Sequence, residues 1–244
     1  MAHLEVLEVA VQFGGLLAVD DASFTVESGR VTGLIGPNGA GKTTLFNVIT
    51  GLQHPTRGRV SLDGADITNT RPHKRARLGI ARTFQRLEAF GSLSAHENVL
   101  VALEMRRRWN KEKYDLHARA DELLERVGIA HVADRTVETL PTGTARLVEL
   151  ARALATDPTI LLLDEPSSGL DEAETDAMSV LLTELARDGL GVLMVEHDMP
   201  LVMETCATIS VLDFGRVIAQ GTPQEIQANP SVQRAYLGTA KETA

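Results

Sequence analysis

Residues 31–44 read VTGLIGPNGAGKTT, in which an apolar run leads into a turn rich in glycine. Apolar residues recur from Leu45 to Ile49, so the turn is predicted to join a strand to a helix. That context distinguishes a phosphate-binding P-loop from a chance glycine turn. The residues assigned to nucleotide binding here are Gly36, Pro37, Asn38, Gly39, Ala40, Gly41, Lys42, Thr43 and Thr44.

The chemistry of this turn predicts that the chain binds a nucleoside triphosphate. Glycines have no Cβ, so consecutive backbone N–H groups can surround anionic oxygens. The helix that begins near Lys42 adds unpaired N–H groups and the positive end of its dipole. Lys42 can reach the β- and γ-phosphates, and the hydroxyl of Thr43 can ligate Mg²⁺.

The composition argues against several other classes of protein. Of the 244 residues, 43% are apolar and 23% are charged, as in soluble globular proteins. A net charge of −9 argues against nucleic acid as the main partner, because phosphate contacts need a concentrated basic surface. No apolar run approaches the roughly 20 residues of a membrane helix, and the first residues predict no secretory signal. With one cysteine, Cys206, we expect a cytoplasmic protein that reaches a membrane only by docking onto another protein.

The pattern along the chain predicts an α/β fold. In the first thirty residues, short runs in which apolar and polar residues alternate indicate short antiparallel strands. Two continuous apolar runs, 160–163 and 192–195, are typical of strands buried on both faces, and the helical pattern between them implies a mainly parallel sheet. From about Leu87 to Thr156 the periodicity is helical. We therefore predict a mainly parallel sheet core with an N-terminal antiparallel β portion and an inserted helical subdomain.

The domain boundaries follow from this pattern. The chain is predicted to be one domain over residues 1–244, in which 1–85 and 157–244 form the β core. The helical subdomain is predicted over residues 86–156.

A pair of carboxylates follows directly after the first of the two buried strands. Taken alone, Asp164 and Glu165 would fit an ordinary polar turn. A carboxylate at the end of a buried strand near a P-loop can hold Mg²⁺, and its neighbour can polarise an attacking water. Together with the P-loop upstream, the pair predicts that Asp164 binds the metal and that Glu165 is the general base.

With these residues in place, the chain resembles ATP-binding cassette (ABC) ATPases along essentially its whole length. The resemblance implies ATP hydrolysis in a P-loop NTPase fold. It assigns Gln85 to sensing Mg²⁺ and the attacking water, and His197 to the γ-phosphate and that water. Phe13 matches the aromatic that stacks on adenine in this family, although a core aromatic is an equal alternative. The segment expected to cross to a partner subunit comprises Ser168, Gly169, Leu170 and Asp171.

The family's signature segment is where this sequence departs from the common form, Leu-Ser-Gly-Gly-Gln. The chain has Leu140-Pro141-Thr142-Gly143-Thr144, so proline replaces the serine and removes a hydroxyl and a backbone N–H. The resemblance places Thr142, Gly143 and Thr144 against the nucleotide of the opposite subunit. Two interpretations stay open: Thr142 substitutes for the serine, which we favour, or the segment forms a weakened half of an asymmetric pair.

Several stretches resemble the ATPase subunits of branched-chain amino acid importers in particular. They are Phe13 to Val19, Arg82 to Gln85, Glu196 to Met199, Gly221 to Ile226, Asn229-Pro230 and Ala235 to Gly238. The resemblance implies import of branched-chain amino acids or related small solutes such as urea and amides. The alternatives are the ATPase of a lipopolysaccharide-type exporter and a non-transport ABC ATPase.

The same resemblance implies the partners. We expect transmembrane permease subunits, a second ABC ATPase subunit that is either a second copy or a paralogue, and indirectly a solute-binding protein. We expect no nucleic acid partner. The chain is then a peripheral protein on the inner face of the cell membrane, with ATP and Mg²⁺ as its cofactors.

Overall fold

A computed structural model describes residues 2–110 and 114–239 of the chain. The apolar run before the glycine-rich turn is β3 (Val31–Ile35), every residue of which is buried. It lies inside a six-stranded sheet of order β10-β9-β3-β8-β7-β6, with β8 and β9 parallel to it on either side. The other strands are β6 (Ile80–Arg82), β7 (Ile160–Asp164), β8 (Gly191–Val195), β9 (Thr208–Asp213) and β10 (Arg216–Gly221). Only β10 runs antiparallel to its neighbour, which confirms the predicted mainly parallel core.

A second, antiparallel sheet contains the N-terminal part of the chain. Its strand order is β2-β1-β4-β5, with bounds β1 (His3–Phe13), β2 (Leu16–Glu27), β4 (Arg57–Leu62) and β5 (Ala65–Asp66). The first two strands are 11 and 12 residues long, longer than the short strands that the alternation predicted. The pairing of β1 with β2 shifts register between Val6 and Val9 and again up to Gln12. Such β-bulges interrupt the alternation of apolar residues, so one long strand looks like several short ones.

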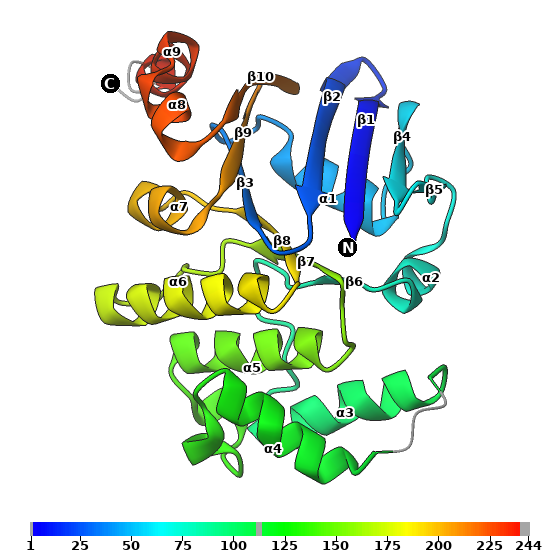
Figure 1. The fold of residues 1–244 in the computed structure, drawn as a ribbon, viewed down its shortest axis with the longest axis vertical. Helices are drawn as coiled ribbons and strands as arrows, with labels where there is room; N and C mark the ends of the chain where they lie inside the picture. The colour runs from blue at the N-terminus through cyan, green and yellow to red at the C-terminus, as the bar shows by residue number, and fades with distance from the viewer. Residues whose placement is uncertain (1, 111–113, 240–244) are drawn as a thin grey trace.

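Helix α1 (Lys42–Thr50) begins directly after the glycine-rich turn and fills the space between the two sheets (Figure 1). Its apolar residues, among them the fully buried Phe46, share one core with the inner faces of both sheets. A second core covers the other face of the six-stranded sheet and continues into the helical part of the chain. The turn is therefore held from both ends by buried elements.

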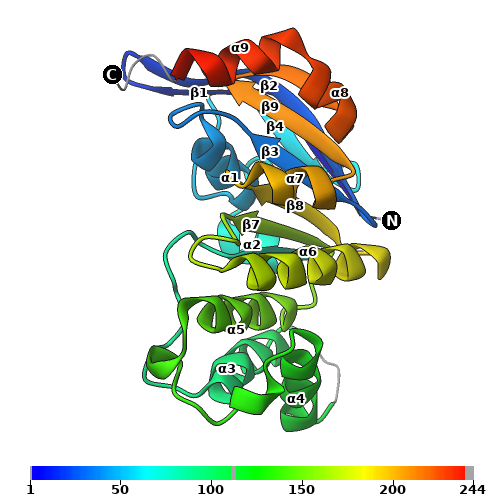
Figure 2. The ribbon, with the colours of Figure 1, turned by 90° about the vertical axis from the view of Figure 1, so that its left-hand side faces the viewer.

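The region between β6 and β7 is helical at the end of the molecule far from the antiparallel sheet (Figure 2). It contains α3 (Ala95–Arg107), α4 (Leu116–Arg126) and α5 (Thr142–Leu154). The predicted helical subdomain 86–156 includes residues 111–113, which lie outside the described residues. Its boundaries therefore stay a prediction. The strand β6 and the helix before it, α2 (Pro72–Arg77), are too short for a periodicity to reveal.

Local capping signals set the starts of the remaining helices, α6 (Glu172–Arg187), α7 (Met199–Thr205), α8 (Pro223–Ala228) and α9 (Pro230–Thr239). A capping box begins α8, with the Thr222 side chain accepting from the backbone N–H of Glu225. Among the residues that the structure describes, no helix is both long and apolar enough to cross a bilayer.

Arg75 ties the C-terminal end of α1 to α2. Its guanidinium is 1% exposed, and Nη1 donates to the carbonyls of Val48 at 2.7 Å and Ile49 at 2.6 Å. The other two nitrogens donate to the carbonyls of Thr68 and Thr70. Burial lowers the pKa of this guanidinium to about 10, which still leaves it charged at neutral pH. One side chain thus pairs the last carbonyls of the helix that carries the glycine-rich turn.

Arg75→Met is expected to lower the free energy of unfolding by about 3 kcal/mol, because four carbonyls lose a donor and two of these hydrogen bonds are buried. Urea unfolding followed by circular dichroism measures the change. The matched control is Lys74→Met, an exposed residue of the same helix. Equal losses in the two variants would contradict the capping role of Arg75.

Candidate nucleotide site

The glycine-rich turn has a backbone shape that only glycine allows at two of its positions. Gly36 has φ of 152°, and a Cβ there would lie 2.0 Å from the carbonyl oxygen of Leu212. Gly41, the N-cap of α1, has φ of 105°, and its Cβ would lie 2.6 Å from the carbonyl oxygen of Ala18. Both side chains would meet backbone rather than a movable side chain. The turn is therefore a preshaped cradle at a helix N-terminus, the kind of site that binds phosphate.

Lys42, the first residue of α1, is only 7% exposed. Its ammonium group donates to the carbonyl of Gly36 at 2.6 Å and to that of Pro37 at 2.9 Å. Burial lowers its pKa, whereas the negative charges of Glu165 and Asp164 raise it. The ammonium group thus folds back over the turn, within electrostatic reach of both carboxylates.

Asp164 ends strand β7 and is 5% exposed. Its Oδ2 accepts a hydrogen bond of 2.8 Å from Nη2 of Arg82, the last residue of β6. The two strands are parallel neighbours, with Arg82 in register with Leu162. The predicted metal ligand is therefore a buried carboxylate that already has a cationic partner in this structure.

Glu165 lies next to the two polar residues that the resemblance assigned to the reaction. Its Oε2 accepts a hydrogen bond of 2.9 Å from Nε2 of Gln85, and its Oε1 lies 3.3 Å from Nε2 of His197. The backbone at Glu165 has φ of 51°, and its N–H donates to the carbonyl of Val195. Both of its oxygens are thus in contact with a predicted catalytic residue.

One cleft of about 310 Å³ collects most of the predicted site. The predicted residues that line it are Asn38, Gly39, Ala40, Gly41, Lys42, Thr43, Thr44, Gln85, Asp164, Glu165 and His197. Residues from the turn, from β7 and from the segments after β6 and β8 therefore meet in one place, as expected where parallel strands end at a common edge.

The oxygen groups in this cleft fit Mg²⁺. Mg²⁺ prefers hard oxygen donors, and three predicted ligands in the cleft supply them. The donors are the hydroxyl of Thr43, the carboxylate of Asp164 and the side-chain amide of Gln85. Over residues 2–110 and 114–239, no group of three or more His, Cys, Asp or Glu side chains could hold a metal alone. Thr43, Asp164 and Gln85 could hold Mg²⁺ together with water and the phosphates of a nucleotide.

Phe13 and the start of the turn lie outside the lining of this cleft. Phe13 ends β1 with its side chain 49% exposed, so the alternative of a core aromatic is excluded for this residue. Its stacking on adenine stays a prediction. Gly36 is buried beneath the turn, and Pro37 lines a separate cavity next to α9.

The signature segment lies apart from this cleft in the same chain. Thr142 is the first residue of α5 and is exposed, and Pro141 is the N-cap of this helix. Gly143 is buried against the segment before α6, since a Cβ there would lie 2.7 Å from Leu170. A Cβ on Gly169 would lie 3.2 Å from the methyl group of Thr142. Residues 142–143 and 169–170 thus form one surface at the start of two helices. Thr144 lines the adjoining cavity between α5 and α6.

Three residues near the site were not singled out from the sequence: Arg82, Asn47 and Glu196. Asn47 accepts a hydrogen bond from Arg82. Glu196 is 3% exposed and accepts backbone N–H bonds from Ser167 at 2.7 Å and His197 at 2.8 Å. It therefore fixes the segment before α6 to the segment that carries His197. A signal for Glu196 was present, namely a charged residue directly after a fully buried strand.

Two family models match the chain. The model described as "ABC transporter" matches residues 19–168, which include the glycine-rich turn, Gln85, the signature segment and the carboxylate pair. The model described as "Branched-chain amino acid ATP-binding cassette transporter" matches residues 216–242.

Two curated relatives and one solved structure match nearly the whole chain. The high-affinity branched-chain amino acid transport ATP-binding protein BraF of Pseudomonas aeruginosa is 42% identical over 97% of this chain and 98% of its own length. The lipopolysaccharide export system ATP-binding protein LptB of Haemophilus influenzae is 37% identical over 98% of each chain. The crystal structure of the ADP conformation of an ATP-binding cassette of an ABC transporter matches with a TM-score of 0.89 and 31% identity, over 98% of this chain and 99% of that one.

Proposed function

The chain belongs to the family of ABC transporter ATP-binding proteins, and we propose that it powers the import of branched-chain amino acids into the cell. It binds ATP and is an ATPase whose hydrolysis is coupled to transport, as in its family. The observation that carries the proposal is the convergence of the glycine-rich turn, Asp164, Glu165, Gln85 and His197 on one cleft. The match of residues 216–242 to the branched-chain amino acid family supports the class of solute.

The backbone N–H groups of the turn and the ammonium group of Lys42 bind the phosphates of ATP. Thr43, Asp164 and Gln85 would hold Mg²⁺, which when bound would neutralise negative charge on the phosphates. Glu165 accepts a proton from the attacking water. Gln85 and His197 each contact one oxygen of Glu165, so they orient the base and the water beside it.

Hydrolysis takes place in a head-to-tail pair of subunits, in which the second is a copy of this chain or a paralogue. The surface formed by residues 142–143 and 169–170 closes over the nucleotide held by the opposite subunit. Because Thr142 stands exposed at the N-terminus of α5, its hydroxyl and the first N–H groups of that helix are available to a phosphate. Thr142 then takes the role of the serine that Pro141 replaces.

Thr142→Ala is expected to lower the kcat of the assembled ATPase about tenfold, the effect of losing one hydrogen bond of roughly 1.4 kcal/mol in the transition state. Steady-state phosphate release measures it. Thr142→Ser keeps the hydroxyl and should retain activity. Thr139→Ala, which removes an exposed hydroxyl just before the segment, serves as the control. Unchanged hydrolysis in Thr142→Ala would favour the weakened half-site instead.

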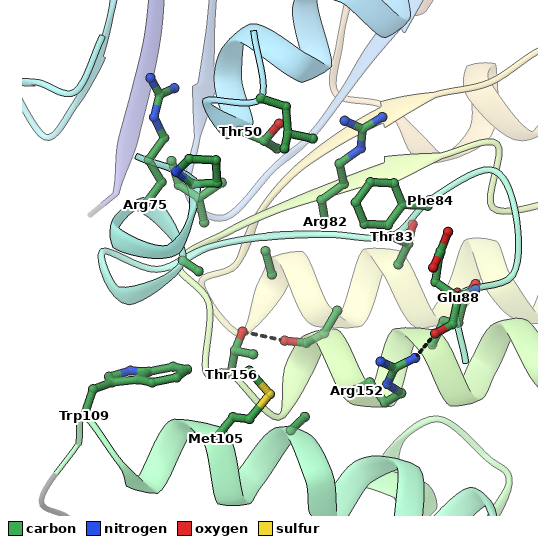
Figure 3. A pocket seen from close by; sticks show the side chains of 18 residues that line it. Thr50, Arg75, Arg82, Thr83, Phe84, Glu88, Met105, Trp109, Arg152 and Thr156 are labelled. Carbon is green, nitrogen blue, oxygen red and sulfur yellow. Dashed lines mark hydrogen bonds between the residues drawn. The ribbon is translucent and has the colours of Figure 1, made fainter. Parts of the chain in front are cut away.

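A groove of about 370 Å³ between the β core and the helical part is the proposed docking site for the permease. Its walls are apolar, from Leu52, Phe84, Met105 and Trp109, and three arginines line it as well (Figure 3). The segment after Gln85 borders this groove, where Arg152 donates to the carbonyl of Glu88 at 2.7 Å. A permease bound here would lie beside residues that lead directly to the catalytic cleft. The chain then sits on the inner face of the membrane.

Import is favoured over the other transport function on two grounds. The importer subunit BraF is 42% identical and the exporter subunit LptB is 37% identical to this chain. The C-terminal family match also names branched-chain amino acids. Urea and short amides stay the alternative solutes. Both relatives are transporter subunits, so transport is favoured over a non-transport role.

Purification of the tagged chain from detergent-solubilised membranes tests this proposal. We expect a polytopic permease to copurify, and addition of the cognate solute-binding protein loaded with leucine to stimulate ATP hydrolysis. A lipopolysaccharide-exporting assembly, a ribosome or DNA in the purified material would contradict import.

A further inference from the structure

Arg82, the last residue of β6, lines the permease groove and is joined by two hydrogen bonds to side chains on other elements, one of them Asp164 of the catalytic cleft. Nη2 donates to Oδ2 of Asp164 at 2.8 Å, and Nη1 donates to Oδ1 of Asn47 on α1 at 2.7 Å. The side chains of Arg82 and Asp164 are each 7% exposed, so this is a buried ion pair. Its guanidinium can neither rotate nor leave without breaking both hydrogen bonds.

Two aromatic rings enclose the same guanidinium. Its carbon Cζ lies 5.2 Å from the ring centroid of Phe46 and 4.8 Å from that of Phe84. Phe46 is fully buried in α1, whereas Phe84 lines the permease groove, where Figure 3 shows it beside Arg82. The guanidinium therefore lies between one ring from the core and one ring from the groove wall. A cation held between aromatic faces in this way is stabilised where it stands.

Asp164 has a second cation nearby, because the ammonium group of Lys42 lines the same cleft and the charge of Asp164 raises the pKa of that group. If Asp164 turned toward that ammonium group, its carboxylate would no longer be available to bind the metal. The ammonium group would likewise no longer be available to bind the phosphates. The bond from Arg82 engages Oδ2 and keeps the carboxylate at the end of β7. A carboxylate that ligates a metal is commonly oriented by such a hydrogen-bonding neighbour.

We propose that Arg82 is a positioning residue for ATP hydrolysis: it fixes Oδ2 of Asp164, keeps this carboxylate apart from Lys42, and presents Oδ1 to Mg²⁺. This inference rests on the proposed role of Asp164 in metal binding and not on the identity of the solute. A structural role alone would make Arg82 important for folding and leave the response to Mg²⁺ unchanged.

The test is the Mg²⁺ dependence of nucleotide binding by the purified chain, followed with a fluorescent ADP analogue and without any turnover. Arg82→Met is expected to raise the Mg²⁺ concentration for half-maximal binding by about 10- to 100-fold. Arg82→Lys, which keeps the charge but loses the second hydrogen bond, is expected to fall between Arg82→Met and the wild type. In steady-state hydrolysis the loss should appear in kcat, with the KM for ATP changed far less.

The chain offers a matched control in another buried arginine. Arg106 pairs with Asp157 at 2.8 Å and stands over the ring of Tyr114, far from the cleft in sequence and outside its lining. Arg106→Met should cost stability comparably and leave the Mg²⁺ dependence at the wild-type value. A wild-type Mg²⁺ dependence in Arg82→Met would overturn the inference and leave a structural role for Arg82.

Asp164→Asn separates this inference from the proposed site. If Asp164→Asn loses its Mg²⁺ response while Arg82→Met keeps it, only the role of Arg82 is wrong. If Asp164→Asn also keeps the wild-type response, the metal site itself is wrong and the inference falls with it. Should Arg82→Met fail to fold, Arg82→Lys decides alone: a half-maximal Mg²⁺ concentration raised several-fold supports positioning, and the wild-type value overturns it.

Discussion

Glu165→Gln is expected to reduce the kcat for ATP hydrolysis by about 10²- to 10⁴-fold while ATP still binds. The amide has nearly the shape of the carboxylate and cannot accept the proton of the attacking water. The contacts of Glu165 with Gln85 and His197 place a proton acceptor directly beside both residues. Because two subunits that close over ATP no longer hydrolyse it, the variant should accumulate as an ATP-bound dimer with the mass of two chains. Phosphate release and light scattering after size exclusion measure the two effects.

Glu204→Gln is the matched control, since it makes the same change at an exposed glutamate of α7. It should hydrolyse ATP at the wild-type rate and show no ATP-induced dimer trap. Hydrolysis retained in Glu165→Gln would remove Glu165 from the role of base and point to another proton acceptor in the cleft.

Lys42→Met is expected to weaken the binding of ATP about 100-fold, corresponding to roughly 3 kcal/mol, and to abolish turnover at cellular nucleotide concentrations. Among the residues that the structure describes, Lys42 is the one lysine in the cleft lining, and its ammonium group already lies against the carbonyls of Gly36 and Pro37. Methionine fills the same space without a charge or a donor. Isothermal titration with ATP measures the loss.

The control for this experiment is Lys74→Met. Lys74 is an exposed lysine on α2, so its replacement should leave the affinity for ATP unchanged. Thermal unfolding of the nucleotide-free variants separates binding from folding. Because burial of the Lys42 charge is itself costly, its replacement should change stability much less than it changes affinity. Tight ATP binding by a folded Lys42→Met variant would contradict the phosphate-binding role.

The central strands and the glycine-rich turn after β3 could be predicted because their signals are local. An apolar run, the three glycines of the turn and a lysine define β3, the turn and the start of α1. The runs that form β7 and β8 stand out for the same reason. By contrast, β6 has only three residues, so no periodicity could reveal it, although it carries Arg82.

The parts of the site that the sequence did not reveal depend on contacts between distant residues. Arg82 meets Asn47 from 35 positions away and Asp164 from 82 positions away, and no local pattern encodes either distance. Glu196 likewise acts on a segment 29 positions earlier. The grouping of Gln85, Glu165 and His197 was expected from family resemblance and not from spacing. Their roles, and that of the signature segment, stay predictions for the experiments above.

Solute uptake by reconstituted vesicles tests the central claim most directly. Proteoliposomes that contain this chain and its permease, with ATP inside and the solute-binding protein outside, would be supplied with radiolabelled leucine. We predict uptake that requires enclosed ATP, is competed by isoleucine and valine but not by urea, and disappears when Glu165→Gln replaces the wild-type chain. Absence of ATP-dependent leucine uptake by an assembly that hydrolyses ATP, or uptake that persists with Glu165→Gln, would contradict the account.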